Sequence, residues 1–475
     1  MQGVRLGRRD FNRGLLGTLL GPAWLGCADG APAVPPGGRV VVVGAGFAGV
    51  TAARALVDRG YAVEVLEARD RIGGRVHTVE EFGTPIDLGA SWLHGGPGNP
   101  LKAIAAEAKI RTWESDYGNG RVYDLREIPR EVGPVGDLSG TRLTDAMESV
   151  SLRPFLELRL RRLLGLGGPP TSAAEILDKA VEKAGASSIE ACVLRQALES
   201  LYASPVEELG FADLLLESRT DPVGGFLPVG EQFVTDGMQR VLDQVRGDLP
   251  VRFEHPVRRI SYGMDGARVE VLDRVFECDA VVLTVSAGLL RAGTVELDPP
   301  LPPSHQRALE TLDLGTLNKV VMFFPRVFWP GTDDFYLSCG GLCSSYWNLW
   351  TYAGAPVLMG LAGGRRALEI EAMTDEEVVA RVRADLARLF GKPAPRPAAY
   401  RVTRWRQDPF ALGSYSRLLP GATGTERQTL AQPVAGRLFL AGEATDPTDP
   451  STVHGAYWSG LRAAAQIAGI PGTPA

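Results

Sequence analysis

The sequence is poor in cysteine and histidine, and it has no excess of positive charge. Its 475 residues include five cysteines and five histidines, and the net charge is −6. The cysteines are scattered, and no CxxC pair or cysteine–histidine cluster predicts a metal site. General nucleic-acid binding requires a basic surface, which this charge does not favour. We therefore expect neither a bound metal ion nor a nucleic-acid partner.

Long apolar runs are also missing, so no stretch is predicted to span a membrane as a helix. Residues 1–38 instead have the layout of an export signal. The twin-arginine pair Arg8-Arg9 precedes a short, moderately apolar stretch, Gly14–Gly26, and then a run rich in small residues and proline, Ala28–Gly38. This order predicts export by a twin-arginine route and a periplasmic or extracellular location.

Three cysteines leave alternatives open. Cys27 follows the apolar stretch and is a candidate site for a lipid anchor, or else a chance cysteine near the end of the signal. Cys339 and Cys343 either form a disulfide in an oxidising compartment or are two ordinary small residues. Their spacing alone does not decide, because a disulfide requires a specific geometry.

A glycine-rich loop, Gly44–Gly49, stands between a predicted strand and a predicted helix. The strand is a run of four valines, Val40–Val43, whose two apolar faces predict burial in a parallel sheet. A second strand, Ala62–Leu66, follows the helix and ends at Glu67. A GxGxxG loop in this context, with an acidic residue after the second strand, predicts a dinucleotide site.

Each part of this loop has a physical task. Gly44 permits the tight turn, Gly46 lets backbone N–H groups approach the pyrophosphate, and Gly49 lets the helix pack close to the strand. The helix is expected over Val50–Arg59, and the partial positive charge at its N-terminus favours phosphate.

A second motif follows the second strand directly. It reads Glu67-Ala68-Arg69-Asp70-Arg71-Ile72-Gly73-Gly74-Arg75. We expect Glu67 to accept hydrogen bonds from ribose hydroxyls and Gly74 to let the chain run close to the cofactor. Arg75 can neutralise phosphate charge as a bidentate donor. Arg71 instead fits a solvated arginine in a basic loop.

The remaining pattern predicts an α/β (α+β) fold with two domains that alternate along the chain. A Rossmann-like dinucleotide domain is expected to be discontinuous, because an apolar strand and a last helix return to it near the C-terminus. It comprises residues 39–95, 230–298 and 425–470, and a substrate domain of mixed sheet and helices comprises residues 96–229 and 299–424. Residues from about 100 to 210 are expected to be largely helical, and Phe233–Leu249 to form one helix.

Motifs along nearly the whole chain after the leader resemble those of the flavin-containing amine oxidases. They are Gly44–Gly49, Arg71–Arg75, Gly89–Trp92, Pro299–Pro303, Asn318-Lys319, Trp405, Asp408–Phe410, Gly413–Tyr415, Gly442-Glu443 and Thr452–Ala456. The family includes polyamine oxidases, monoamine oxidases, histone lysine demethylases and L-amino-acid oxidases, and these motifs look most like the polyamine oxidase and lysine demethylase branch. The resemblance implies FAD. Monoamine oxidases attach FAD through a cysteine shortly before the last helix. No cysteine follows Cys343, so we expect non-covalent FAD.

The resemblance implies roles for five residues near the reacting amine. Lys319 matches the lysine that holds a water molecule near flavin N5, and burial would lower its pKa, which suits proton traffic. Trp405 matches the tryptophan packed against the flavin. Tyr415 and Tyr457 match two aromatic residues that flank the amine. His94 matches a histidine at the substrate entrance. The alternatives are a surface lysine, two core tyrosines and a turn histidine.

The resemblance also implies the cofactor contacts. The expected FAD contacts are Gly44, Gly46, Phe47, Ala48, Gly49, Glu67, Ala68, Arg69, Gly74, Arg75, Gly89, Ala90, Ser91, Trp92, Val257, Gly442, Glu443, Thr452 and Val453. Glu443 is expected near the phosphate or ribitol. Thr452 and Val453 begin the last helix, whose N-terminus favours the negative charge of reduced flavin.

The implied reaction is oxidation of a C–N bond of a polyamine-like or other amine. Hydride passes to flavin N5, the imine is hydrolysed, and O₂ or another electron acceptor reoxidises the flavin. One alternative is an L-amino-acid or natural-product tailoring oxidase, which needs an arginine facing the substrate carboxylate. A second is a flavin-bearing protein without turnover. Carboxylates facing the substrate would favour a polyamine, and Glu199, Glu207 and Glu208 are the candidates.

Overall fold

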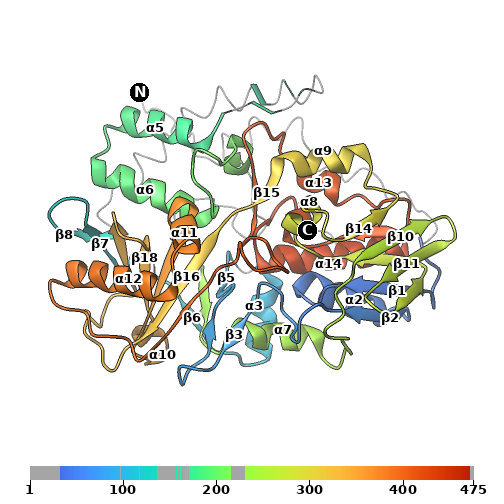
Figure 1. Ribbon diagram of the computed structural model, residues 1–475, viewed down its shortest axis with the longest axis horizontal. Coiled ribbons are helices and arrows are strands. Elements are labelled where there is room, and N and C mark those ends of the chain that lie inside the picture. Colours follow the sequence, from blue (N-terminus) through green and yellow to red (C-terminus); the bar gives the residue numbers. More distant parts are fainter. Residues whose placement is uncertain are drawn as a thin grey trace, which may run out of the picture.

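The computed structural model describes residues 33–470 apart from residues 97, 117, 136–156, 159–160, 162–165, 167, 170 and 216–229. The predicted export signal, with Arg8-Arg9 and Cys27, lies outside the described residues. No helix in the described ranges is long and apolar enough to cross a membrane. Two large bodies of sheet stand at opposite ends of the molecule (Figure 1).

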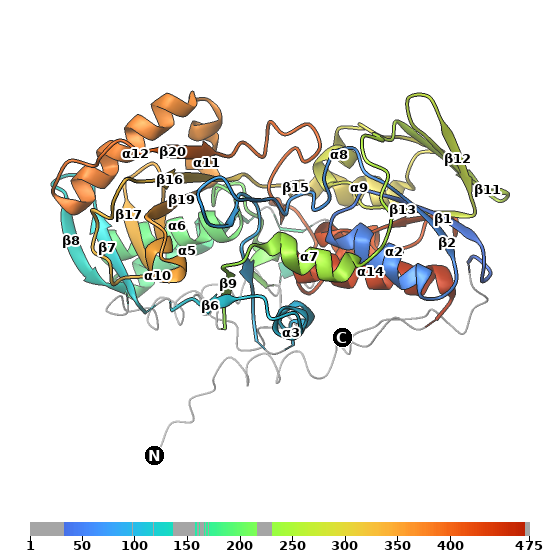
Figure 2. The ribbon, with the colours of Figure 1, turned by 90° about the horizontal axis from the view of Figure 1, so that it is seen from below.

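A four-stranded parallel sheet builds one end. Its order is β2 (Ala62–Leu66), β1 (Arg39–Val43), β13 (Ala280–Leu283) and β22 (Leu438–Leu440). Helices α2 (Phe47–Val57) and α14 (Val453–Ala468) run side by side against it in both ribbon views (Figures 1 and 2). Strands from three distant parts of the sequence therefore form one sheet, and the carboxyl ends of these strands lie at one edge.

The valines of β1 show why this sheet is buried on both sides. Val40 and Val42 belong to the core formed with α2 and α14. Val41 and Val43 belong to a second core. That core lies against a mixed sheet ordered β12 (Val275–Cys278), β11 (Gly266–Glu270), β10 (Arg259–Gly263) and β14 (Glu296–Asp298). Successive side chains of a strand point to opposite faces, so the four valines serve both cores.

A seven-stranded sheet organises the other end. Its order is β20 (Ala399–Val402), β16 (Leu317–Phe323), β19 (Val357–Gly363), β18 (Ser345–Asn348), β17 (Phe335–Cys339), β7 (Gly120–Asp124) and β8 (Arg130–Pro134). Val320 of β16 packs in the core that includes α12 (Asp375–Phe390), whereas Val321 packs in the opposite core with Ile86. Lys319 has the parity of Val321, so the pleat directs it toward the Ile86 side.

The expectation that residues 100–210 are largely helical is wrong for their first third. Helix α3 (Pro100–Glu107) is followed by the strands β6 (Thr112–Glu114), β7 and β8. Strand β7 pairs in parallel with β17, which lies more than 200 residues away. No local sequence pattern predicts this pairing. Helices α5 (Ala173–Ala184) and α6 (Ser188–Leu201) then follow.

The single helix expected over Phe233–Leu249 is also wrong at its start. Its first residues form β9 (Gln232–Val234), the central strand of a small sheet with β5 (Trp92–Leu93) and β6. The helix, α7, spans Met238–Arg246. Gly237, with φ of 86°, separates the two. This small sheet joins residues from both predicted domains.

Cys339 does not pair with Cys343. It forms a disulfide with Cys192 of α6, at a Cα–Cα distance of 6.1 Å. Cys343 is a free, buried thiol in the core on the α12 side of the sheet. On the other side, Phe335 and Leu337 of β17 share a core with residues of α6, and Cys339 has their parity. The two cysteines therefore face opposite cores.

We expect the disulfide to stabilise the fold, because it closes a loop with a sequence separation of 147 residues. Replacing Cys192 with serine is expected to lower the free energy of unfolding by about 2–4 kcal/mol. Urea unfolding with and without a thiol reductant measures this. Reductant should weaken the wild type and the control variant Cys278→Ser alike, but not Cys192→Ser. Equal stability of oxidised and reduced wild type would contradict the prediction.

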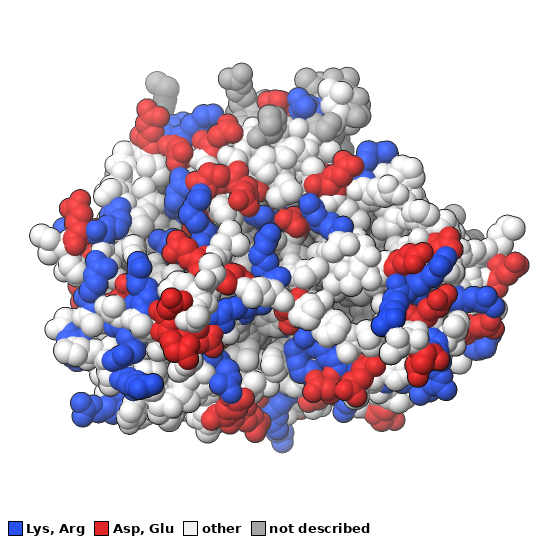
Figure 3. Space-filling model, viewed as in Figure 1, with Lys and Arg blue, Asp and Glu red and all other residues white. Residues whose placement is uncertain are grey.

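Acidic and basic side chains are interspersed over the face seen in Figure 3, without a large patch of one sign. Charges of opposite sign also pair on the described surface, as Arg259 does with Asp298 at 2.6 Å and Arg268 with Glu277 at 2.8 Å. The negative net charge of the chain therefore does not make this face predominantly acidic.

Candidate active site

Two glycine-rich loops meet at the carboxyl edge of the parallel sheet. Gly46 forms a β-bridge with Gly73, and the Gly73 N–H donates to the Ala45 carbonyl at 2.9 Å. The buried Glu67 carboxylate accepts the N–H of Ala45 at 2.8 Å and that of Arg69 at 2.9 Å. Glu67 thus holds the two loops together, a task that adds to its expected contact with the ribose.

Two glycines at this edge have open space beside their Cα atoms. A Cβ built on Gly46 meets nothing closer than the Gly73 carbonyl oxygen, at 3.7 Å, and one on Gly442 meets nothing within 4 Å. In contrast, a Cβ on Gly49 would lie 2.0 Å from the Gly44 carbonyl oxygen. Gly49 therefore permits close helix packing, whereas Gly46 and Gly442 face room for a ligand, beside the N-terminus of α2.

Arg75 and Glu443 form an ion pair at this edge. Arg75 Nη1 lies 2.6 Å from Glu443 Oε1 and also donates to the Ser414 carbonyl at 3.0 Å. Burial raises the pKa of Glu443, but Arg75 and the Ser416 hydroxyl outweigh it and hold that pKa below its ordinary value. The ionised carboxylate orients Arg75, whose positive charge suits a phosphate.

Arg71 is not a solvated loop residue. Its guanidinium donates to the carbonyl oxygens of Ile72, Gly74 and Val76 at 3.0–3.2 Å. Burial lowers its pKa. Arg71 therefore braces the turn at Gly74, a task that the sequence does not signal because its partners are backbone atoms.

The other arginine of this motif, Arg69, pairs with Asp408 at 2.6 Å and lies 5.2 Å from the centre of the Phe410 ring. The chain before Val257 runs along the same motif, since the His255 N–H donates to the Glu67 carbonyl at 2.8 Å. Val257 itself is partly buried at that edge. Ala68 belongs to this motif, and the Ala90 N–H donates to the Arg75 carbonyl at 3.2 Å.

Lys319 lies in a buried ring of oxygen atoms. Its ammonium group donates to the carbonyl oxygens of Asp87 at 2.8 Å and Gly89 at 2.6 Å, and to the Ser91 hydroxyl. The centre of the Trp92 ring is 5.6 Å away. Only 3% of Lys319 is exposed. The residue is therefore not a surface lysine.

Burial is the largest influence on the pKa values of Lys319 and Asp87. It lowers the pKa of Lys319 to about 8, against an opposing effect of the Asp87 carboxylate. It also raises the pKa of Asp87 to about 6, against hydrogen bonds from Thr78 and the Met238 N–H. A neutral lysine can still be satisfied here, because Ser91 can donate to its lone pair while the two carbonyls accept.

Trp405 is held next to Lys319. Its indole N–H donates to the Leu88 carbonyl at 3.3 Å, between the two carbonyls that bind Lys319. Its backbone N–H donates to Asn318 Oδ1 at 3.1 Å, and Asn318 Nδ2 donates to Glu371 at 2.9 Å. Asn318 was part of the recognised motif, but its task of fixing Trp405 depends on partners that the sequence does not place.

The aromatic residues expected around the amine are placed as follows. The Tyr415 hydroxyl donates to the Ser200 carbonyl at the end of α6, and the partly buried Tyr457 lies in the second turn of α14 against Trp458. Trp92 donates to Ser115 Oγ at 3.1 Å. The flanking role of the two tyrosines stays a prediction.

His94 binds the buried carboxylate of Glu231, and 42% of the His94 side chain is exposed. Burial lowers the pKa of His94, but Glu231 outweighs it and the pKa lies above its ordinary value. The Gly95 N–H donates to the same carboxylate at 3.1 Å. His94 is thus an ordered, partly exposed group, and its place at a substrate entrance stays a prediction.

The last helix begins where the flavin edge was expected. Thr452 is the N-cap of α14, and its hydroxyl accepts the Gly455 N–H at 2.9 Å. Val453 is the first helical residue, so the positive end of the helix dipole lies at these two residues. Their contact with a flavin stays a prediction.

Comparison with known proteins decides the family. The family model for flavin containing amine oxidoreductases matches residues 47–468. The chain belongs to this family. Polyamine oxidase 2 of Arabidopsis thaliana is 33% identical over 445 residues, which cover 90% of the chain and 87% of the relative. Polyamine oxidase 4 of Oryza sativa subsp. japonica is 33% identical over 454 residues, 91% of the chain and 88% of the relative.

Other similarities support the same branch and fold. Lysine-specific histone demethylase 1 homolog 1 of Oryza sativa subsp. japonica is 33% identical over 466 residues, 92% of the chain and 53% of that protein. A structure of putrescine oxidase bound to putrescine, 22% identical, matches with a TM-score of 0.74 over 90% of the chain and 98% of that structure. The predicted family, the mixed α/β fold and the FAD-dependent oxidoreductase class are confirmed for this amine oxidase.

Proposed function

We propose that this amine oxidase oxidises a C–N bond of a polyamine-like or other primary or secondary amine. The observation that carries the proposal is Lys319, buried among three oxygen atoms beside Trp405. When bound, FAD supplies the redox chemistry by taking a hydride from the carbon next to the amine nitrogen and reducing O₂ to H₂O₂. Hydrolysis of the imine gives a carbonyl compound together with an amine from a secondary amine, or ammonia from a primary amine.

The residues of the chain bind, orient and move protons in this proposal. Arg75 and the N–H groups at the start of α2 would hold the phosphates, and Glu67 the ribose. Lys319 would hold a water molecule at Nζ, and above its pKa of about 8 the neutral amine would accept a proton there. Tyr415 and Tyr457 would orient the amine by cation–π attraction until it loses its proton.

FAD is proposed to bind without a covalent bond. The sequence has no cysteine after Cys343, and Cys343 is buried in the core on the α12 side of the seven-stranded sheet. Affinity therefore depends on the loops around Gly46 and Gly74 and on Arg75.

Three carboxylates considered as polyamine sites are already paired. Glu199 lies 3.4 Å from Arg366, Glu207 lies 2.6 Å from Arg195, and Glu208 lies 2.9 Å from Arg417. The pairing neutralises their attraction for a distal ammonium group. Each of these three arginines is likewise paired with a carboxylate of the chain. The aromatic residues are therefore proposed as the main recognition element.

An anaerobic screen tests the function. Holoenzyme is mixed with spermine, spermidine, their acetylated forms, putrescine, aromatic monoamines or L-amino acids, and the flavin absorbance is followed. We expect a polyamine or a related amine to bleach the flavin, and 1,4-butanediol, the diol matched to putrescine, to have no effect. Bleaching only by L-amino acids would favour the tailoring or amino-acid oxidase, and bleaching by no amine would contradict the enzyme proposal.

Export of the folded enzyme completes the proposal. The Arg8-Arg9 pattern supports a twin-arginine route, which suits a protein that must capture FAD in the cytoplasm. The Cys192–Cys339 disulfide also supports a final location in an oxidising compartment, where disulfides persist. We also propose that Cys27 carries a lipid that anchors the exported enzyme to a membrane.

A further inference from the structure

Asp213 and Arg427 form a fully buried ion pair. Asp213 lies in η2 (Phe211–Leu215) and Arg427 in α13 (Glu426–Leu430), and the two are 2.9 Å apart. Their side chains are 0% and 3% exposed. Burying two charges carries a large desolvation cost, so such a pair is weak evidence for stability alone. The other hydrogen bonds that Asp213 and Arg427 make indicate what this ion pair does.

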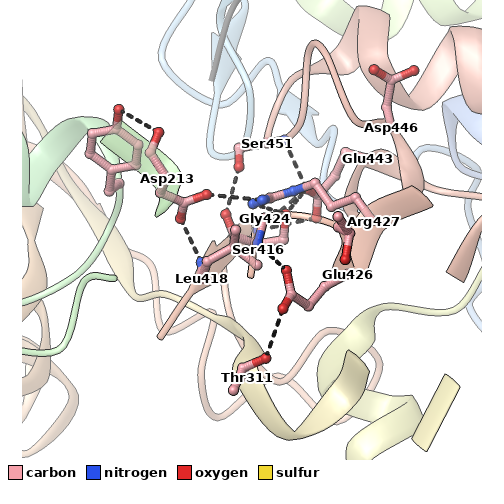
Figure 4. Close-up of polar contacts among 12 residues, drawn as sticks. Asp213, Thr311, Ser416, Leu418, Gly424, Glu426, Arg427, Glu443, Asp446 and Ser451 are labelled. Carbon is pink, nitrogen blue, oxygen red and sulfur yellow. Dashed lines mark hydrogen bonds and ion pairs between the residues drawn. The ribbon is translucent and has the colours of Figure 1, made fainter. Parts of the chain in front are cut away.

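Hydrogen bonds through Ser416 connect Arg427 to the Glu443 carboxylate, which orients Arg75. Arg427 Nη2 donates to Ser416 Oγ at 3.4 Å, and that hydroxyl donates to Glu443 Oε2 at 2.6 Å (Figure 4). The Ser416 N–H also donates to Glu443, at 3.2–3.3 Å. The other oxygen of Glu443 accepts Arg75. One hydroxyl therefore joins the buried arginine to the cofactor carboxylate.

Glu443 is also hydrogen-bonded to the residue just before the N-cap of α14. It accepts the N–H of Ser451 at 2.8 Å, and the Ser451 hydroxyl donates to the Ser416 carbonyl at 2.6 Å (Figure 4). Ser451 has a φ of 65°, a conformation that a non-glycine residue adopts at a cost. Thr452, the N-cap of α14, comes next. The same polar group therefore fixes the position where α14 begins.

Asp213 holds the strand that carries Ser416. Its second oxygen accepts the N–H of Leu418, in β21 (Ser416–Leu418). Tyr415 directly precedes this strand and is bound to α6 through Ser200. The neighbours Tyr415 and Ser416 therefore connect the predicted substrate side to Glu443.

We infer that the Asp213–Arg427 pair is a positioning device for the cofactor, acting through Ser416 and Glu443 on Arg75 and on the start of α14. The inference rests on the proposed FAD-dependent function. Without the pair, Ser416 loses the charge that orients its hydroxyl, and Glu443 loses part of its support. Arg75 and Ser451 then lose a fixed partner, so FAD binds less tightly and in a less defined environment.

The test compares FAD release from purified holoenzymes by flavin fluorescence, together with the visible spectrum of the bound flavin and thermal melting. Asp213→Asn and Arg427→Gln are expected to raise the FAD dissociation constant about tenfold or more, the effect of one lost charge-assisted hydrogen bond. The spectrum of the remaining bound flavin is expected to shift. The matched control, Arg195→Gln, removes the exposed pair with Glu207 and should leave both readouts unchanged.

A double variant separates positioning from simple stability. Replacing a buried pair with apolar residues of similar size often restores stability. Asp213→Leu/Arg427→Met is therefore expected to melt like the wild type and still release FAD faster. Recovery of wild-type FAD affinity and spectrum in this variant would overturn the inference, as would single variants with unchanged affinity. A wild-type protein that binds no FAD would instead overturn the proposed function.

Discussion

Replacing Lys319 with methionine is expected to slow reduction of the bound flavin by the amine about 10²-fold or more, the usual contribution of a placed proton-transfer group. Methionine is close in length but offers no proton acceptor and no hydrogen bond to the carbonyls of Asp87 and Gly89, which bind Lys319 now. Stopped-flow measurement of flavin reduction under anaerobic conditions gives the rate. The exposed Lys179 of α5, changed to methionine, is the control and should have no effect.

The pH dependence gives a second readout of the same change. The folded pKa of Lys319 is lowered to about 8 from its ordinary value of 10.5. Between these values the unfolded chain binds more protons than the folded one, so the contribution of Lys319 to stability rises with pH across this window. Below pH 8 the full cost of charging the buried amine applies, of the order of 3 kcal/mol.

The stability of Lys319→Met relative to wild type is therefore expected to fall as the pH rises from 8 toward 10, on top of a pH-independent cost of leaving the Asp87 and Gly89 carbonyls without a donor. The reduction rate of this variant should also lack an ionisation near pH 8 that the wild type shows. Urea unfolding of both proteins at several pH values, with the same buffer series for the kinetics, checks the two expectations. A rate equal to that of wild type, with the ionisation intact, would show that Lys319 is structural.

The cofactor half of the fold was predictable because its signals are local. The strand Ala62–Leu66 has the predicted bounds, and β1 and α2 lie within a few residues of the expected ones. One motif of about 35 residues contains the strand, the loop, the helix and Glu67. The strand β7 was missed because it is stabilised by β17, far along the chain, and by burial of Val122 in that sheet.

The residues at the centre of the site could be predicted from the sequence, but the residues that hold them in place could not. The sequence predicts Lys319 and Trp405 as site residues, and the structure brings them together around the Asp87–Gly89 carbonyls. The sequence predicts no bracing role for Asn318, Arg71 or the Asp213–Arg427 pair. Their partners are backbone carbonyls or residues up to 214 positions away, and such contacts leave no spacing or periodicity in a sequence. Charged residues that brace a site look like ordinary surface charges until burial is known.

Replacing Gly46 with valine is expected to weaken FAD binding strongly while leaving the apoprotein folded. Gly46 has φ of −78° and ψ of −177°, which a β-branched residue adopts readily. The new Cβ would meet no atom of the chain within 3.7 Å. Stability of the apoprotein should therefore change by only about 0.5 kcal/mol, as for an open surface site.

The same side chain occupies the space in which the pyrophosphate must approach the backbone N–H groups of the loop. Loss of two charge-assisted hydrogen bonds, about 1.5–3 kcal/mol each, raises the FAD dissociation constant about 10²-fold or more. Titration of apoprotein with FAD, paired with thermal melting, measures both quantities. Gly263→Val is the control, because a Cβ at Gly263 has open space too, with nothing within 4 Å, but lies in the β10–β11 turn. If Gly46→Val bound FAD as the control does, the phosphates could not lie against this loop, and Arg75 would need another explanation.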